Sequence, residues 1–387
     1  MKEWKKVKLG EISSNIQTGP FGSQLHQSDY STEGIPVVMP KDIVNGRIDV
    51  SSIARVEEHH VNRLSRHKIN GEDILYARRG DVGKCAYVTN EQKSWLCGTG
   101  CLRVTIDRLK ANPKFVFFFL QTAPSIGWVE NHAIGSTMLN LNTSILSEVP
   151  VYLPSLPIQH RIAEILSRYD SLIENYQKQI KLLEESAQRL YKEWFIDLRF
   201  PGHENTKIVD GVPEGWEKAN LGMLVEFKRG KTITKKETIE GHIPVVAGGL
   251  EPAYYCNKFN TSERVITISG SGANAGYTSM YFEKVWASDC SFADSSMTPY
   301  LHFVFCFLHD NKTIIDNMQK GAAQPHVYAK DINLMEICIP TENVLKSFEE
   351  RASKYFDTIS SLQSQIRHLT EARDRLLPKL MSGEIKV

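Results

Sequence analysis

The stretch EWKKVKLGEI at residues 3–12 returns as GWEKANLGML at residues 215–224, in the second half of the chain. In this pair Trp4 matches Trp216, and the Leu-Gly step that follows it is conserved between the copies. Self-similarity at so large a distance indicates a structural unit that occurs twice. The rest of the chain shows how far the repeat extends.

Further matches follow in the same order along both halves. They are IPVVMPKDI (35–43) with IPVVAGGL (243–250), LYARRGDVGK (75–84) with VITISGSGANAG (265–276), KFVFFFLQT (114–122) with LHFVFCFLHD (301–310), AIGSTM (133–138) with QKGAAQ (319–324), and VPVYLP (149–154) with MEICIP (335–340). Agreement in order at so many places predicts a tandem duplication.

Each copy is β-rich first and helical last. Short β-branched and aromatic runs separated by Gly, Pro, Asn and Asp predict strands and turns. After the closing proline, apolar residues recur in steps of three and four over Ile162–Trp194 and Leu345–Leu376, which predicts coiled-coil helices roughly 50 Å long. Pro378 is expected to end or kink the second helix.

The fold class expected is therefore α+β: a duplicated β-rich domain, each copy followed by a long helix, with the two helices paired as an antiparallel coiled coil. The predicted division is a first domain at 1–157, a central helix at 158–200, a second domain at 201–340 and a C-terminal helix at 341–387.

Composition and charge argue against a strongly basic protein, a secreted or membrane protein and a metal-binding protein. The chain has 387 residues, 41% of them hydrophobic, and a net charge of +1, so any nucleic-acid surface must be local. No secretory or membrane-spanning segment is expected, and seven cysteines without a CxxC pair favour a reducing cytoplasm. Cys97 and Cys101 could share a metal, but no second ligand pair follows, so no metal site is predicted.

The motifs that suggest catalysis fail one by one. Gly80 and Gly83 are too close for a phosphate-binding loop, and a cysteine follows Lys84 where Ser or Thr is needed. Met297-Thr-Pro-Tyr300 lacks the polar residue and one proline of an adenine methyltransferase turn, and no Gly-x-Ser-x-Gly elbow occurs. A metal-dependent nuclease needs an acidic residue followed by Glu-x-Lys. Asp81, Glu91 and Lys93 match that pattern, but such spacing arises by accident about as readily as by design. No catalytic residue is predicted.

The polar, glycine-rich turns of both copies instead suggest contacts to DNA. Glycines permit a close approach to a phosphodiester backbone, and Arg, Lys, Asn and Gln can meet phosphates or base edges. The alternative is that the glycines close hairpins and the arginines pair with acids such as Asp81. The predicted DNA-binding residues are, in the first copy, Gln17, Gly19, Phe21, Gly22, Ser23, Lys41, Arg78, Arg79, Gly80, Lys84, Ser136, Thr137, Asn140 and Asn142, and, in the second, Lys228, Arg229, Lys231, Ser269, Ser271, Asn274, Lys320, Gln324 and His326.

At this point the chain resembles the specificity subunit of Type I restriction–modification systems. The most specific stretch is RLYKEWFIDLRFPG at 189–202, followed by DGVPEGWE at 210–217, which is similar to that family's central junction. Further similar stretches are QTGPFGSQL (17–25), MPKDI (39–43), ARRGDVGK (77–84), LPIQHRIAEIL (156–166) and RLLPKLMSGEIKV (375–387). The segment NVLKSFEERAS at 343–353 departs from the pattern, because it lacks counterparts of Pro157 and Gln159.

The resemblance implies a non-catalytic subunit whose two recognition domains each read one half of a split, asymmetric site in double-stranded DNA. It further implies that two methyltransferase subunits and the restriction/translocase subunits dock on the chain, and that S-adenosylmethionine, ATP and Mg²⁺ belong to those partners. No cofactor and no membrane contact are expected for the chain itself. Two other readings are a fused restriction–modification enzyme, which would need the missing methyltransferase motifs, and a tandem-repeat protein-binding scaffold.

Overall fold

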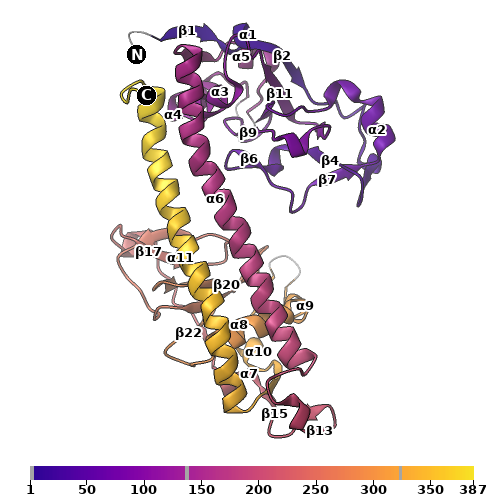
Figure 1. The fold of residues 1–387 in the computed structure, drawn as a ribbon, viewed down its shortest axis with the longest axis vertical. Coiled ribbons are helices and arrows are strands. Elements are labelled where there is room, and N and C mark those ends of the chain that lie inside the picture. The colour runs from indigo at the N-terminus through magenta and orange to yellow at the C-terminus, as the bar shows by residue number, and fades with distance from the viewer. Residues whose placement is uncertain (1–3, 136–138, 322–324) are drawn as a thin grey trace. The chain divides into compact units, whose positions relative to one another are not determined.

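The computed structural model describes residues 4–135, 139–321 and 325–387. The chain forms two compact units, one made of Met1–Ile173 with Arg367–Val387 and the other of Glu174–Ile366. Each unit contains a β-rich domain together with parts of two long helices, α6 (Leu156–Tyr191) and α11 (Glu342–Met381) (Figure 1). The β-rich-then-helical order predicted for both copies is therefore confirmed.

In the first unit the central sheet has the order β2-β11-β8-β9, and all its pairings are antiparallel. A second sheet has the order β10-β4-β7-β3, with β10 parallel to β4. Strand β1 pairs with β12 and so joins the start of the domain to its end. The strands are β1 Lys5–Lys8, β2 Ser13–Thr18, β3 Tyr30–Ser31, β4 Ile35–Val38, β5 Ile43–Val44, β6 Arg47–Ile48, β7 Ala54–Val56, β8 Ile74–Ala77, β9 Cys85–Tyr87, β10 Leu96–Cys97, β11 Cys101–Ile106 and β12 Pro150–Leu153.

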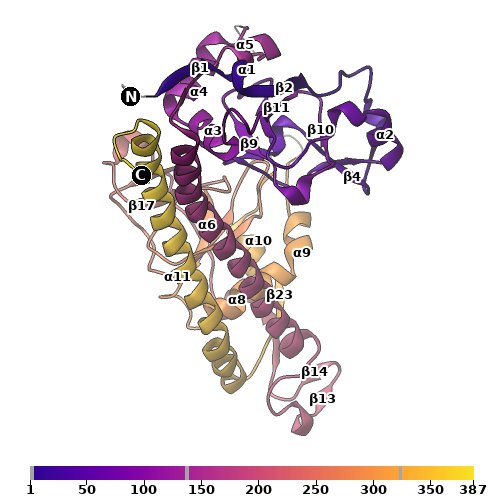
Figure 2. The same cartoon turned by 45° about the horizontal axis from the view of Figure 1, so that its top comes forward.

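The second unit repeats the central sheet and the pairing of its first and last strands, but its second sheet lacks a counterpart of β3, and the described residues contain no counterpart of the β5-β6 hairpin. Its central sheet is β16-β22-β19-β20, its second sheet is β18-β17-β21 with β17 parallel to β21, and β15 pairs with β23. A small hairpin of β13 and β14 precedes the domain (Figure 2). The strands are β13 Ile208–Val209, β14 Val212–Pro213, β15 Glu217–Asn220, β16 Lys228–Arg229, β17 Ile243–Val246, β18 Tyr254–Cys256, β19 Val265–Ser269, β20 Thr278–Tyr281, β21 Trp286–Ala287, β22 Cys290–Asp294 and β23 Glu336–Ile339. The tandem duplication is thus visible in the fold.

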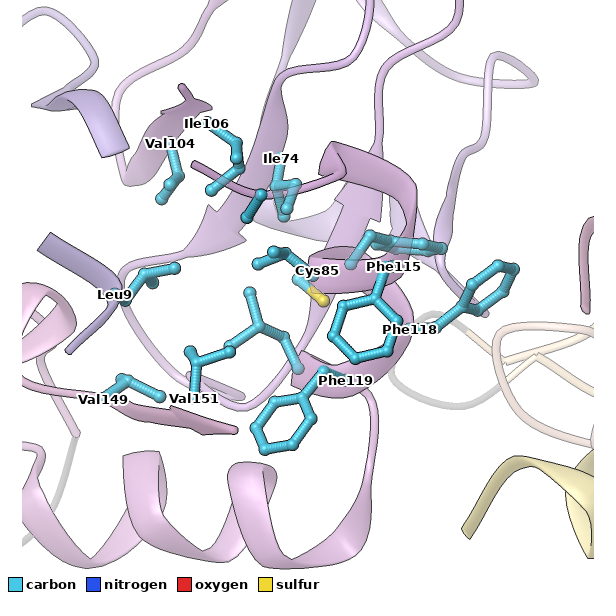
Figure 3. Packing of buried hydrophobic residues seen from close by; sticks show 14 of the residues in the cluster. Leu9, Ile74, Cys85, Val104, Ile106, Phe115, Phe118, Phe119, Val149 and Val151 are labelled. Carbon is cyan, nitrogen blue, oxygen red and sulfur yellow. The ribbon is translucent and has the colours of Figure 1, made fainter. Parts of the chain in front are cut away.

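The core of the first unit forms where helix α3 (Pro113–Leu120) packs against the central sheet. Pro113 suits the first helical position, and the Asn112 side chain caps the helix by accepting from the Phe115 N–H at 2.9 Å. Phe115, Phe118 and Phe119 of α3 project into a cluster with Val104 and Ile106 of β11 (Figure 3). The other helices of this unit are α1 Leu9–Ile12, α2 Glu58–Arg63, α4 Ala123–His132 and α5 Thr143–Ser147.

The second unit caps the equivalent helix, α8 (Leu301–Asp310), by a different residue. Tyr300 precedes α8 and gives no side-chain cap. Glu349 of α11 supplies the cap instead. Its carboxylate accepts from the Phe303 N–H at 2.8 Å and lies 2.7 Å from Nδ1 of buried His302. The other helices here are α7 Leu221–Leu224, α9 Lys312–Asn317 and α10 Ala329–Asn333.

The long helices run antiparallel within each unit. In the first unit Asp170 of α6 pairs with Arg373 of α11 at 2.9 Å, and Ile162 joins the same core as Leu380. In the second unit the rings of Tyr191 and Phe348 lie 6.3 Å apart. Residues later in α6 therefore contact residues earlier in α11, so the two helices run in opposite directions. This confirms the predicted antiparallel coiled coil.

One detail of helix α6 differs from the sequence prediction. The three–four spacing over Ile162–Trp194 places Leu172 in the apolar seam, but Leu172 is 42% exposed and its neighbour Ile173 is buried, because the spacing shifts by one residue at this turn. Helix α11 passes through Pro378 to Met381, so of the two effects expected of this proline, ending the helix is not observed. A five-residue π-helical turn, Lys192–Ile196, follows α6 at the central junction.

Candidate nucleic-acid interface

Three turns that are distant in the sequence meet at one end of the central sheet in the first unit. The Gly19 N–H donates to the Cys101 carbonyl at 2.9 Å, and the Arg78 N–H donates to the Gly100 carbonyl at 2.7 Å. The third turn joins through the Leu141 N–H, which donates to the Arg78 carbonyl at 2.8 Å. These bonds bring the turns around residues 19, 78–84 and 139–142 together.

The second unit forms the same bonds between matching residues. The Gly230 N–H donates to the Cys290 carbonyl at 2.8 Å, the Gly270 N–H to the Asp289 carbonyl at 3.1 Å, and the Val327 N–H to the Gly270 carbonyl at 3.1 Å. A short bridge between Arg79 and Asn140 in the first unit has its counterpart between Ser271 and His326 in the second. We call the two faces built by these bonds the first and second turn faces.

Glycine is required in these turns for two separate reasons. A Cβ on Gly19 would lie 2.0 Å from the Gly98 carbonyl oxygen, and one on Gly230 would lie 2.4 Å from that of Ser288, so both positions need a bare backbone. Gly80 and Gly272 instead have positive φ angles of 74° and 82°. No atom of the described residues lies within 4 Å of a Cβ built at either, so neither glycine is packed against that part of the chain.

On the first turn face, several predicted side chains are available for contacts. Arg79 and Lys84 are exposed, and Lys84 lies 2.8 Å from Asp81. The Arg78 guanidinium lies over the ring of Phe21 at 5.8 Å, and Phe21 is itself 55% exposed. The alternative of arginines paired with Asp81 is not observed among the described residues, where Asp81 pairs with Lys84 instead.

On the second turn face the basic residues Lys228 and Arg229 lie exposed on strand β16, with Lys231 exposed just beyond it. Lys320 is held by Asp331 at 2.9 Å. The His326 ring stacks on Tyr328 with centroids 6.0 Å apart.

Other predicted residues occupy positions inside the fold. Gln17 joins a network with His67 and the Arg66 carbonyl, Asn142 caps α5 by accepting from the Ile145 N–H, and buried Ser269 donates to the Gly248 carbonyl. The remainder divide between the surface and undescribed positions. Gly22, Ser23 and Lys41 are exposed, Asn274 is half-buried, and Ser136, Thr137 and Gln324 lie outside the described residues. DNA contact by each member of the set stays a prediction.

The first turn face contains buried polar atoms without a hydrogen-bond partner in the described part of the chain. They are Arg78 Nε, Thr99 Oγ1 and Asn140 Oδ1. Native proteins leave few such groups unsatisfied, and each one calls for a reason, such as a bound water or ion, strain or a functional role. A polar ligand at this face would complete them.

A fourth segment of each turn face escaped the sequence prediction. It contains Thr99 and Gly100 in the first unit and Asp289 in the second. The signal was the pair CGTGC (97–101) and ASDC (287–290), which end in matching cysteines. Burial raises the pKa of the Cys290 thiol to about 12, so this cysteine is a neutral packing group behind the face.

Among residues 4–135, 139–321 and 325–387, no group of three or more His, Cys, Asp or Glu side chains is arranged to hold a metal ion. No helix in the same ranges has the length and apolar character needed to cross a membrane.

Comparison with solved structures defines the class of fold. A crystal structure of the Type I restriction–modification system S subunit from M. genitalium superposes with a TM-score of 0.61 at 18% identity, covering 98% of this chain and 96% of that one. Among curated proteins, the Type I restriction enzyme MjaIX specificity subunit of Methanocaldococcus jannaschii is 28% identical over 100% of this chain and 94% of its own length. The HindI specificity subunit of Haemophilus influenzae is 21% identical, with both chains fully covered.

The protein-family model named Type I restriction modification DNA specificity domain matches residues 1–185 of this chain and, a second time, residues 213–371. The chain therefore belongs to this family. It is a non-catalytic DNA sequence-specificity subunit of a Type I restriction–modification complex, and the resemblance noted in its sequence is confirmed. Specificity subunits have no catalytic cofactor of their own, and they act on DNA as part of an assembly with other subunits. The fused-enzyme and scaffold readings are not favoured.

Proposed function

We propose that each unit reads one half of a split, asymmetric DNA site through its own turn face. The repeated set of three backbone hydrogen bonds carries this proposal, because it builds one face per unit from matching turns whose polar side chains differ. A conserved frame with divergent side chains is the arrangement expected for two readers of different bases. On this view the chain divides into a first domain at 1–157, a central helix at 158–200, a second domain at 201–340 and a C-terminal helix at 341–387.

Within the first face we assign base or phosphate contacts to Arg78, Arg79, Lys84 and Asn140. Their side chains are exposed, or, for Arg78 and Asn140, include a polar atom left without a partner in the described residues. Arginine favours the O6 and N7 atoms of guanine, and asparagine favours adenine. Residues such as Gln17 and Gly19 shape the turns that present these side chains.

Within the second face the same reasoning selects Lys228, Arg229, Lys231, Ser271 and His326. The first three are exposed cations, for which phosphates are the general partner. Ser271 and His326 occupy the positions that Arg79 and Asn140 hold in the first unit. The two faces therefore differ most at the side chains best placed to distinguish bases.

The helices α6 and α11 are proposed to set the gap between the half-sites and to provide docking surfaces for two methyltransferase subunits. Exposed polar residues cover much of both helices, as a docking surface requires. Restriction/translocase subunits complete the nuclease. S-adenosylmethionine, ATP and Mg²⁺ are assigned to these partners, and the complex is expected to act on DNA in the cytoplasm.

Domain exchange tests the proposal. Residues 201–340 are replaced by the equivalent domain of another family member, and the methylated motif of cells producing the complex is read by methylome sequencing. One half of the motif is expected to change and the other to persist. A change in both halves would show that the units do not read independently. Titration of the purified chain with duplex DNA in rising salt adds a second measurement, since phosphate contacts give a steep negative slope in log affinity.

A further inference from the structure

We infer that Asp289 reads a base in the second half-site by accepting a hydrogen bond from an amino group in the major groove, either N4 of cytosine or N6 of adenine. The inference rests on the proposed use of the second turn face for DNA. It assigns to that face a specificity-determining residue and the chemical class of base that this residue requires.

The placement of Asp289 follows from the internal comparison of the two units. Its carbonyl accepts the Gly270 N–H, just as the Gly100 carbonyl accepts the Arg78 N–H in the first unit. The second face therefore carries a carboxylate where the first carries a glycine with no side chain. Asp289 lines a shallow hollow together with Arg229, Gly270, Ser291, His326 and Tyr328.

The carboxylate is oriented by its neighbour. Ser271 Oγ donates to Oδ2 of Asp289. No hydrogen bond to Oδ1 occurs among the described residues, so this oxygen is left to accept from a ligand. Gly270 keeps the approach open, because a Cβ at that position would lie 3.4 Å from Oδ1 and 3.2 Å from the Asp289 carbonyl oxygen.

The negative charge of Asp289 favours a hydrogen-bond donor over a phosphate as its ligand. No cation forms an ion pair with it in the described part of the chain, although the face around it carries Lys228, Arg229 and Lys231. A carboxylate without a cation repels phosphates, so its presence on a DNA-binding face opposes affinity unless it meets a donor. An ionised carboxylate only accepts hydrogen bonds, and the major groove offers amino donors on cytosine and adenine alone.

The test is selection from a pool of duplexes with a randomised central segment, using the purified full-length chain. The wild-type protein is expected to enrich a two-part motif with cytosine or adenine required at one position of the second half. D289A removes the acceptor, so the requirement for an amino group at that position is expected to be lost. D289N keeps the shape and the bond from Ser271, and its amide oxygen can still accept from an amino group, so it is expected to favour adenine. D81N is the matched control: it removes the same charge from the first face and should leave the second half unchanged.

A second measurement isolates the amino group. The base identified by selection is replaced by its analogue without the amino group, purine for adenine or pyrimidin-2-one for cytosine. The wild type should bind the altered duplex about five- to a hundred-fold more weakly, whereas D289A, which has no acceptor, should bind both duplexes alike.

Failure of the inference and failure of the proposed function are distinguishable. If the wild type enriches a two-part motif and D289A keeps the same motif while binding all duplexes more tightly, Asp289 is only a repulsive charge near phosphates and the inference is overturned. If the wild type enriches no two-part motif, the division of reading between the units is itself wrong, and the role of Asp289 falls with it.

Discussion

The Glu349 carboxylate caps helix α8 from another helix, with its Oε1 atom 2.8 Å from the backbone nitrogen of Phe303. It also meets His302, which is buried, so both donors lose their partner when the carboxylate is removed. Glu349→Ala is expected to lower the free energy of unfolding by about 1–3 kcal/mol, measured by urea denaturation of the full chain. Glu350→Ala removes an exposed neighbour on the same helix and should change it by less than about 0.5 kcal/mol. Equal effects of the two variants would contradict the capping role.

Gly19 is expected to tolerate no side chain. Gly19→Ala places a methyl group 2.0 Å from the Gly98 carbonyl oxygen, and backbone must move to relieve the contact. We expect a loss of about 1–3 kcal/mol in unfolding free energy, as for other overpacked sites. Gly22→Ala, three residues on, meets no atom within 4 Å in the part of the chain that the structure describes and serves as the control. A Gly19 variant as stable as the Gly22 variant would show that the turn can shift freely.

Arg79 is exposed on the first turn face, beside Asn140. If its side chain pairs with a base, Arg79→Ala should weaken binding by about 1–3 kcal/mol and relax one position of the first half-site. If it meets only phosphate, affinity should fall for all sequences and the salt slope should decrease by about one. Binding of duplexes to the purified chain distinguishes these results. Arg375→Ala, which removes an exposed arginine from α11, should leave both quantities unchanged.

The length of helix α6 is predicted to set the gap in the DNA site. Four residues inserted beside exposed Gln179 add roughly 6 Å of helix. The preferred gap is therefore expected to lengthen by one or two base pairs at about 3.4 Å each, with both half-site sequences preserved. Methylome sequencing measures the gap directly. The control insertion is placed at the Asp210–Gly211 turn, outside both helices. An unchanged gap in an active complex would identify the helices as tethers.

Stability is expected to decline in alkaline solution. Burial raises the pKa of the Cys85, Cys97 and Cys290 thiols from 9.0 to about 12. The unfolded chain therefore loses these protons first, so their contribution is complete below pH 9 and is lost as the pH rises toward 12. Urea unfolding at several pH values under reducing conditions measures the decline. Cys290→Ala should reduce its slope by roughly 1.4 kcal/mol per pH unit, the share of one proton.

The sequence predicts the fold well because duplication and helix periodicity are both recorded in the order of apolar residues. The sequence predicts the start of the second long helix, α11, less well. The segment around Glu349 lacks counterparts of Pro157 and Gln159, and only the structure shows that Glu349 reaches α8 to replace the cap that Asn112 gives to α3. Long-range caps leave no local pattern.

The candidate interface could be predicted in part for a related reason. Glycine turns with basic residues are visible in the sequence, and the structure does bring the predicted turns together. Whether a polar side chain in such a turn faces outward depends on neighbours from other strands. Asn142 and Ser269 are engaged internally, whereas Thr99 and Asp289 reach the faces from segments with no basic residue to mark them.

The first unit is not a contiguous piece of the chain, because Leu380 and Met381 complete its core. During synthesis the N-terminal domain therefore waits for residues 380 and 381 before its apolar surface is closed. A stop codon placed before Leu380 would leave the earlier-made domain incomplete. Recombination that imports a new first domain likewise succeeds only if the existing helix α11 packs against the new core. The sequence near Leu380 therefore limits which first domains the chain can accept.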